Sequence, residues 1–168
     1  MPRALFWKDF IRLVNSEICM KTLVALPERC TGCQRCVLAC SYAHAQSFSP
    51  SKSRIWVVRA KRRIDYPIFC NQCGLCVGAC PAGALSRDAK TGAVVVDEEK
   101  CVGCGFCVRA CPWGLIVLDS ETGKAIKCDL CGGDPACVKE CPEAALLFVD
   151  LNEAASAKRS LLVRLLGE

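Results

Sequence analysis

Cysteine is the residue type whose spacing says most about the chemistry of this chain. Seventeen of the 168 residues are cysteine, and all but Cys19 fall into four groups of four. Three groups follow the spacing Cys-x2-Cys-x2-Cys-x3-Cys, and the fourth has five residues between its second and third members. The groups are Cys30, Cys33, Cys36 and Cys40; Cys70, Cys73, Cys76 and Cys80; Cys101, Cys104, Cys107 and Cys111; and Cys128, Cys131, Cys137 and Cys141. Three thiolates on one turning loop with a fourth close behind are typical of cubane iron–sulfur ligation.

The last cysteine of each group is expected to serve a neighbouring cluster. It lies three residues after the third cysteine, and in three groups it precedes a proline, Pro81, Pro112 or Pro142. Chains with this spacing and two clusters exchange that ligand between the clusters. We therefore predict four [4Fe-4S] clusters, with the sixteen grouped cysteines as iron ligands. Spacing alone permits two pairings, the first group with the second and the third with the fourth, or a nested order.

Zinc and disulfides are the alternative uses of so many cysteines. Zinc ribbons hold the metal with two well-separated Cys-x2-Cys pairs, whereas each group here has a third and a fourth cysteine close behind. A disulfide framework requires an oxidising compartment. The first residues contain no apolar signal core, because Asp9, Arg12 and Glu17 interrupt them. No apolar run is long enough to span a bilayer, so we expect a reducing cytoplasm and iron.

The charge and the motifs exclude two other classes of function. The formal charge is +5, but four clusters at about −2 each, thiolates included, bring the loaded protein to about −3. We therefore expect no nucleic-acid partner, and we interpret the basic run from Arg59 to Arg63 as a solvated hairpin or a docking edge. The sequence contains no nucleophile–base pair, no glycine-rich nucleotide loop and no open metal position, so no enzymatic activity is predicted.

Short strands and turns must position the cysteine loops. Residues 55–58 and 64–69 form one predicted hairpin, and residues 85–97 and 115–126 form two more. The latter two turn near Thr91-Gly92 and Thr122-Gly123. Each cysteine group is expected to form a loop with one helical turn. The predicted fold class is α+β, with tandem modules of small hairpins and short helices around four cubane clusters.

The two ends of the chain lie outside the repeat. Phe6, Phe10, Val14 and Ile18 recur at helical spacing, so residues 1–19 form a predicted helical extension. Residues 151–168 form a predicted C-terminal helix with Asn152 as its N-cap. Its apolar end contains Leu161, Leu162, Leu165 and Leu166. Each helix either packs on its own domain or docks a partner subunit.

Two segments carry a family resemblance. One runs from Cys30 through Cys40-Ser41-x2-His44-x3-Phe48-x-Pro50-x2-Ser53-Arg54-Ile55, and the other is Lys127-Cys128-Asp129-Leu130-Cys131-Gly132-Gly133-Asp134-Pro135-x-Cys137. Over about residues 20–150 the chain resembles the four-cluster subunits related to those of dimethyl-sulfoxide reductase and formate dehydrogenase. Within that group it is most similar to the subunits that serve tungsten aldehyde oxidoreductases, class II benzoyl-CoA reductases and carbon-monoxide dehydrogenase.

The resemblance implies the nested pairing of the groups. The implied sets are Cys30, Cys33, Cys36 with Cys141; Cys128, Cys131, Cys137 with Cys40; Cys70, Cys73, Cys76 with Cys111; and Cys101, Cys104, Cys107 with Cys80. Residues 20–150 then form one four-cluster domain. Its inner half spans about residues 66–120, and its outer half combines residues 20–65 with 121–150.

The resemblance also implies a function. The expected role is relay of single electrons between a large catalytic subunit, best matched by a tungsten aldehyde oxidoreductase, and a redox partner. That partner is a flavin protein, a ferredoxin or further copies of this chain. The alternatives are a free polyferredoxin and an electron-transfer subunit of a formate dehydrogenase, a hydrogenase or a carbon-monoxide dehydrogenase complex.

Four further residues have weaker predicted roles. His44, the only histidine, either donates a hydrogen bond to a cluster sulfur or braces its loop, and the second is favoured. Trp56 and Trp113 are expected to pack beside clusters and shield them from water. Cys19 is expected to be a buried or incidental thiol.

Overall fold

The computed structural model describes residues 20–59 and 64–166. Within these residues the strands form separate two-stranded antiparallel ribbons. β1 (Lys21–Ala25) pairs with β8 (Leu146–Asp150), β2 (Ile55–Arg59) with β3 (Asp65–Phe69), β4 (Leu85–Arg87) with β5 (Val94–Val96), and β6 (Ile116–Leu118) with β7 (Ala125–Lys127). The helices are α2 (Arg35–Ala45), α3 (Leu75–Gly78), α4 (Phe106–Ala110), α5 (Ala136–Lys139) and α6 (Leu151–Leu166), with short 3₁₀ turns at Pro27–Arg29, Pro50–Lys52 and Leu130–Gly133. This mixture confirms the predicted α+β class.

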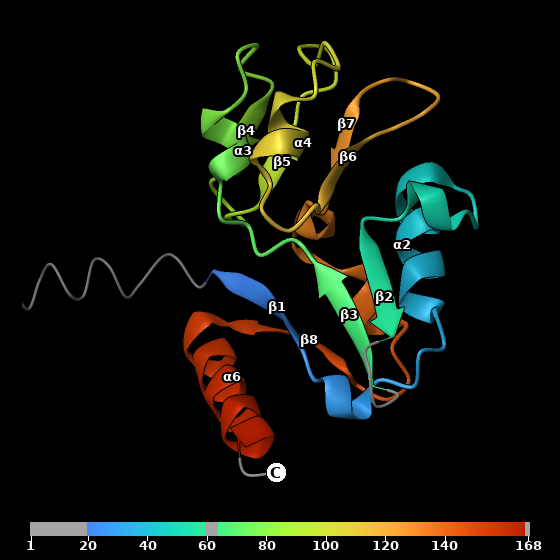
Figure 1. The fold of residues 1–168 in the computed structure, drawn as a ribbon, viewed down its shortest axis with the longest axis vertical. Coiled ribbons are helices and arrows are strands. Elements are labelled where there is room, and N and C mark those ends of the chain that lie inside the picture. The colour runs from blue at the N-terminus through green and yellow to red at the C-terminus, as the bar shows by residue number, and fades with distance from the viewer. Residues whose placement is uncertain (1–19, 60–63, 167–168) are drawn as a thin grey trace, which may run out of the picture.

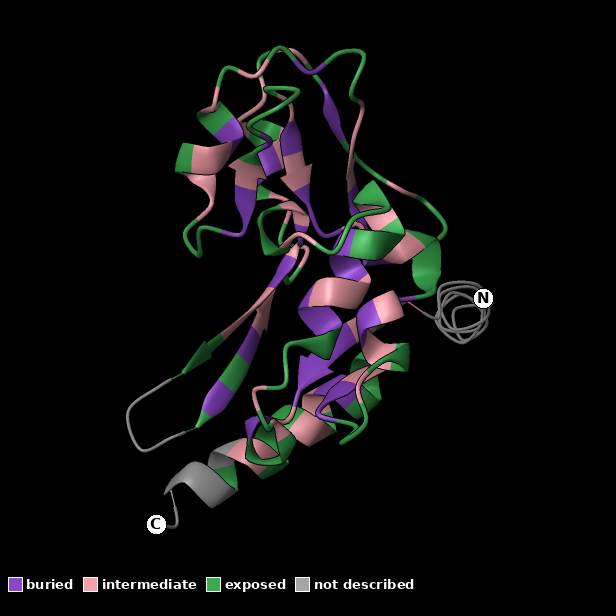
Figure 2. Ribbon diagram, turned by 90° about the vertical axis from the view of Figure 1, so that its right-hand side faces the viewer, coloured by how far each residue is buried: buried purple, intermediate pink, exposed green. Residues whose placement is uncertain are grey.

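The ribbons gather into two modules, each with its own core (Figure 1). The inner module contains β4 to β7 with α3 and α4, and it buries Val94 and Ile116. The outer module contains β1, β2, β3 and β8 with α2 and α5, and it buries Ile55 and Leu146. Figure 2 shows buried residues running through both modules, while the loops are largely exposed. Because β3 pairs with β2 and β7 packs beside β5, the chain passes between the modules after Phe69 and again after Lys127.

The two inner ribbons turn in the same way because their sequences repeat an Asp-x-x-Thr-Gly pattern. Asp88 Oδ1 accepts hydrogen bonds from the backbone N–H and the hydroxyl of Thr91, both over 2.7 Å. Asp119 and Thr122 make the equivalent bonds over 3.2 Å and 2.9 Å. The residue after each threonine has positive φ, +69° at Gly92, which glycine adopts without steric cost. Both predicted turns are confirmed.

The β1–β8 ribbon joins the first strand of the described chain to its last strand. Lys21 lies opposite Asp150, and Ala25 lies opposite Leu146. Leu23 and Leu146 are 3% and 1% exposed, so the ribbon contributes its alternate side chains to the outer core. The outer module is therefore completed only when segments from both ends of the chain have met.

Helix α6 follows β8 without a loop, and its cap differs from the prediction. The Asp150 carboxylate accepts hydrogen bonds from Asn152 N over 2.8 Å and from Glu153 N over 2.9 Å, which is the N-cap pattern. The prediction that Asn152 is the N-cap was therefore wrong. A carboxylate also suits the positive end of the helix dipole. The helix packs against β1 and β8 and buries Ala154.

Several predictions fall outside the described residues. They concern the N-terminal extension 1–19 with Cys19, the basic residues 61–63, and the side chains of Leu162, Leu165 and Leu166. Among the helices that are described, none has both the length and the apolar character needed to cross a bilayer.

Replacing the capping carboxylate tests this helix start. Asp150→Ala should destabilise the first turn of α6 by about 1 kcal/mol, which makes its amides exchange with solvent about fivefold faster. Asn152→Ala is the control, because Asn152 contributes only its backbone N–H to the cap. Hydrogen–deuterium exchange of the α6 peptides measures both. Faster exchange in Asn152→Ala than in Asp150→Ala would restore the original assignment.

Candidate iron–sulfur sites

Three cavities in the described part of the chain are each lined by four cysteines. Each set combines the first three cysteines of one group with the last cysteine of another. The sets are Cys30, Cys33, Cys36 and Cys141 in the outer module, and Cys70, Cys73, Cys76 and Cys111, and Cys80, Cys101, Cys104 and Cys107 in the inner module. The other walls are mostly apolar, and no histidine lines any of the three. Four thiols around an apolar cavity fit the donor set of a cubane cluster.

The remaining four cysteines also lie near one another, in the outer module. Cys40, Cys128 and Cys137 belong to one buried group of side chains. Burial and the charges of Cys128, Cys40 and Cys131 raise the pKa of the Cys137 thiol above its usual range. Between Cys40 and Cys131 stands His44, whose ring nitrogens lie 3.8 Å and 3.9 Å from the two sulfurs. These four thiols therefore offer a fourth set of sulfur donors.

The cysteine loops share a backbone pattern that follows the sequence repeat. The second and the fourth residue after the first cysteine have positive φ in every group: Gly32 and Gln34, Gln72 and Gly74, Gly103 and Gly105, and Leu130 and Gly132. Glycine fills five of these eight positions because it has no Cβ to clash there. At Gln34, Gln72 and Leu130 the same turn costs about 1–2 kcal/mol. The loop geometry is thus required at all four sites, with or without glycine.

Burial raises the pKa of several of these thiols, which favours their protonated form until a metal binds. It raises the pKa of Cys36 to about 11 and that of Cys128 to about 12, from an ordinary value of 9.0. Iron binds thiolates, so ligation must release these protons. Cys40 differs, because the hydrogen bonds from His44 and Arg54 N–H outweigh its burial and lower its pKa. Cys40 is therefore the most readily ionised buried member of its set.

Backbone N–H groups point at the sulfur of the last cysteine in each group. In the three groups with proline, the donor is the fourth residue after the cysteine, in a turn where proline itself has no N–H. The pairs are Ala84 N with Cys80 Sγ and Leu115 N with Cys111 Sγ over 3.3 Å, and Ala145 N with Cys141 Sγ over 3.2 Å. Cys40, which lacks the proline, accepts from Arg54 N over 3.3 Å instead. Such bonds stabilise the thiolate and tune the reduction potential of a bound cluster.

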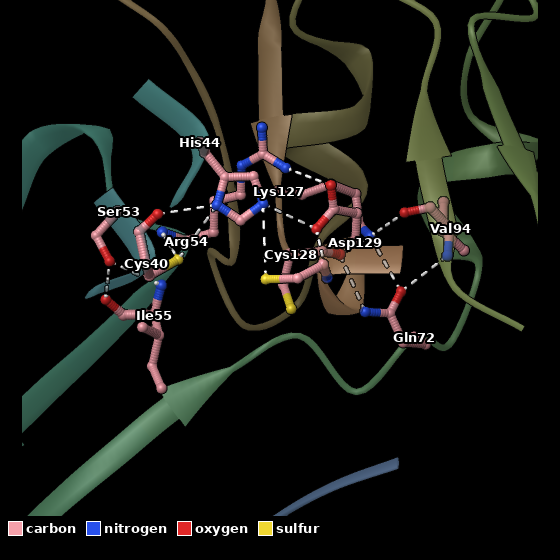
Figure 3. A network of polar contacts seen from close by, with 11 residues as sticks. Cys40, His44, Ser53, Arg54, Ile55, Gln72, Val94, Lys127, Cys128 and Asp129 are labelled. Atoms are coloured by element: carbon pink, nitrogen blue, oxygen red, sulfur yellow. Dashed lines mark hydrogen bonds and ion pairs between the residues drawn. The ribbon is translucent and has the colours of Figure 1, made fainter. Parts of the chain in front are cut away.

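His44 belongs to an ionic network beside the fourth set (Figure 3). Its Nε2 lies 3.0 Å from Asp129 Oδ1, its Nδ1 lies 2.9 Å from the Cys40 carbonyl oxygen, and Arg54 donates to Asp129 Oδ2 over 2.7 Å. Hydrogen bonds with Asp129, Cys131 and Cys40 raise the pKa of His44 to about 12. Burial disfavours the Asp129 carboxylate, but His44 and Arg54 outweigh it and hold its pKa well below its usual range. The 3.0 Å contact of His44 with Asp129 holds α2 against the loop of Asp129. The longer contacts of His44, at 3.8 Å and 3.9 Å, reach the sulfurs of Cys40 and Cys131.

Arg54, Asp129 and Lys127 had no role assigned from the sequence. Most of their partners are distant in sequence, so local patterns could not identify them, although Lys127 and Asp129 flank a cysteine. The tryptophan prediction holds in part. Trp113 lines the cavity of Cys70 to Cys111 but stays 65% exposed, so it shields that cavity on one side only. Trp56 is half-buried in β2.

Comparison with known proteins agrees with this geometry. Residues 63–151 match the 4Fe-4S dicluster domain family, and residues 27–43 match a 4Fe-4S binding domain. The chain belongs to the 4Fe-4S dicluster family. The prediction of an iron–sulfur electron-transfer subunit built from ferredoxin-like domains is thereby confirmed. The number of clusters and the assignment of each cysteine to one of them stay predictions.

The relatives of this dicluster protein include subunits of several oxidoreductases. The "aliphatic sulfonate oxidoreductase, polyferredoxin-like subunit" of Pyrococcus furiosus is 47% identical over 124 residues, which are 73% of this chain and 72% of the relative. The "NADH-dependent phenylglyoxylate dehydrogenase subunit beta" of Aromatoleum evansii is 39% identical over 133 residues, which are 76% of this chain but only 30% of the relative. A solved "active site complex BamBC of benzoyl coenzyme A reductase" with 1,5-dienoyl-CoA matches 86% of this chain and 90% of its own, at 28% identity and a TM-score of 0.47.

Two glycines of one cysteine loop provide a matched test of the loop geometry. Gly103 and Gly105 both have positive φ, but a Cβ on Gly103 would fall on the carbonyl oxygen of Gly123, whereas one on Gly105 meets nothing within 4 Å. Gly105→Ala should cost about 1–2 kcal/mol of stability through backbone strain and keep its iron. Gly103→Ala should separate this loop from the β6–β7 turn and remove about four irons per chain. Iron and sulfide analysis after anaerobic purification measures both variants, and equal iron loss would contradict the expectation.

Proposed function

We propose that this protein relays single electrons through four [4Fe-4S] clusters and performs no catalysis of its own. The observation that carries the proposal is the set of three cavities, each lined by four cysteines drawn from two groups. A structural zinc site needs no such exchange, because two Cys-x2-Cys pairs suffice. The fourth set is supported by the shared burial of Cys40, Cys128 and Cys137, and by His44, whose ring nitrogens lie 3.8 Å from Cys40 Sγ and 3.9 Å from Cys131 Sγ.

The proposed ligation is nested. The outer module would hold one cluster with Cys30, Cys33, Cys36 and Cys141 and another with Cys128, Cys131, Cys137 and Cys40. The inner module would hold one with Cys70, Cys73, Cys76 and Cys111 and another with Cys101, Cys104, Cys107 and Cys80. When bound, each cluster accepts and returns one electron. The protein supplies sulfur donors, N–H bonds to sulfur and a largely apolar surround.

The four sets follow one another along the two modules. The charge of Cys36 in the first outer set raises the pKa of Cys137 in the second, so these two sets are neighbours. In the same way, the charge of Cys70 in the first inner set raises the pKa of Cys128 in the second outer set. The two inner sets share one core, in which α3 packs against α4. A row of this kind supports a path across both modules. The second cysteines Cys33, Cys73 and Cys104 are exposed, which offers contact points for electron donors and acceptors.

We further propose that the partners are a large catalytic oxidoreductase subunit and a separate redox partner, in a reducing cytoplasm. The support is that the relatives from Pyrococcus furiosus and Aromatoleum evansii are named as subunits of oxidoreductases. Those two enzymes act on different organic compounds, a sulfonate and phenylglyoxylate, so the relatives do not identify one substrate. A partner of the tungsten aldehyde oxidoreductase type stays a prediction.

Paired cysteine substitutions test the nested ligation. The unaltered chain should contain about sixteen irons, and Cys33→Ala or Cys141→Ala alone should leave about twelve. If both cysteines serve one cluster, the double variant Cys33→Ala with Cys141→Ala should also keep about twelve irons. The control pairs Cys33→Ala with Cys131→Ala, which belong to different sets, and should keep about eight. Iron analysis after anaerobic reconstitution gives the numbers, and about eight irons in both double variants would reject the nested order.

Purification of the native chain tests the proposed partner. We expect it to elute in a complex with a larger subunit that carries its own cofactor, as seen by size-exclusion chromatography and mass spectrometry under anaerobic conditions. Recovery of the protein only as an abundant free monomer, active with soluble donors and acceptors, would instead support a diffusing polyferredoxin.

A further inference from the structure

Lys127 is a buried cation at the junction of the two modules. It ends β7, directly before Cys128, and it is only 3% exposed. Lysine is almost never this buried unless its charge is paired. Yet every acceptor that its Nζ reaches among the described residues is neutral: the carbonyls of Val94 and Cys128, both over 2.6 Å, and Gln72 Oε1 over 3.1 Å.

The surroundings of Lys127 are built to hold an ammonium in one position. Three acceptors match the three N–H donors of the charged form (Figure 3). Gln72 is itself fixed, because its Oε1 also accepts from Val94 N over 2.9 Å and its Nε2 donates to the Cys128 carbonyl over 3.0 Å. This arrangement supplies hydrogen bonds but no negative charge. A buried cation is costly without one, so its counter-charge must come from elsewhere.

Two of the four cysteine sets lie on either side of this ammonium. Lys127 lines the cavity of Cys70, Cys73, Cys76 and Cys111 in the inner module. Its Nζ also binds the backbone of Cys128, which belongs to the adjacent set of the outer module. Lys127 therefore lies between one cysteine set of the inner module and one of the outer module.

We propose that the Lys127 ammonium is a fixed counter-charge shared by the two middle clusters of the row, and that it raises the reduction potential of both. This inference rests on the proposed nested ligation. Each cluster with its thiolates is anionic, and reduction adds one more negative charge, which a nearby cation stabilises in a low-dielectric interior. One electron crosses the junction, and no bond is made or broken at Lys127. Lys127 therefore stabilises the reduced form of both clusters at the junction of the two modules.

Removing the charge should lower two potentials and leave two unchanged. In Lys127→Met, the reduction equilibria of two of the four clusters should fall about tenfold each, which is about 59 mV for a one-electron couple. Anaerobic redox titration followed by electron paramagnetic resonance measures this, with iron analysis to show that all clusters are present. Lys127→Arg retains the charge and should keep the original potentials.

Lys100 provides a matched control. It precedes the first cysteine of its group just as Lys127 does, but its side chain is 64% exposed and its ammonium pairs with Asp97 over 2.6 Å. Its charge is already screened by water and by that partner. Lys100→Met should therefore shift no potential. The inference would be overturned if Lys100→Met shifted the potentials as much as Lys127→Met does. It would also be overturned if Lys127→Met lowered all four potentials equally.

Gln72→Glu tests the same charge without opening a cavity. The new carboxylate would lie against Lys127 Nζ and cancel its charge locally, so the same two potentials should fall. This variant decides the matter if Lys127→Met loses iron. If the unaltered protein contains four clusters and Gln72→Glu lowers no potential, the role of Lys127 is overturned and the proposed function stands. Fewer than four clusters in the unaltered protein would instead overturn the proposed function.

Discussion

Ligation of iron by thiolates is the interaction on which the rest of this structure depends. The ribbons have only three to five residues per strand, and two-stranded ribbons of that size are not stable alone. Cysteines also make up a large part of both cores, with Cys36, Cys40, Cys128 and Cys137 in the outer one. The hydrophobic cores and the proposed metal sites therefore share the same residues. Binding energy gained there, less the cost of ionising buried thiols, is at the same time folding energy.

How much the sequence predicts depends on how local each interaction is. The cysteine loops and the turns after Thr91 and Thr122 could be predicted, because a few adjacent residues determine them. The β1–β8 ribbon could not, because its strands are weakly patterned and lie at opposite ends of the chain. The α6 cap was misplaced by two residues because Asp150 and Asn152 are both suitable caps and only the end of β8 decides between them.

The polar residues beside the clusters are the part that local patterns miss. A lysine at the end of a short strand is normally expected in solvent, yet Lys127 is buried and donates a hydrogen bond to Gln72 of another loop. Asp129 likewise binds His44 and Arg54, which are far from it in sequence. Both networks tie the first half of the chain to the segment around Cys128. Each network joins segments that carry cysteine ligands through hydrogen bonds.

The pairing of β1 with β8 also bears on how the protein is made. The inner module is continuous in sequence, whereas the outer module needs residues from both sides of it. During synthesis the chain leaves the ribosome at about 5–20 residues per second, and a domain folds as a unit once its residues have emerged. The inner module thus has all its ligands available while Cys141 and β8 are still being translated. Iron delivery would then proceed from the inside of the sequence outward, and the outer loops would wait, as exposed thiols, for the last strand.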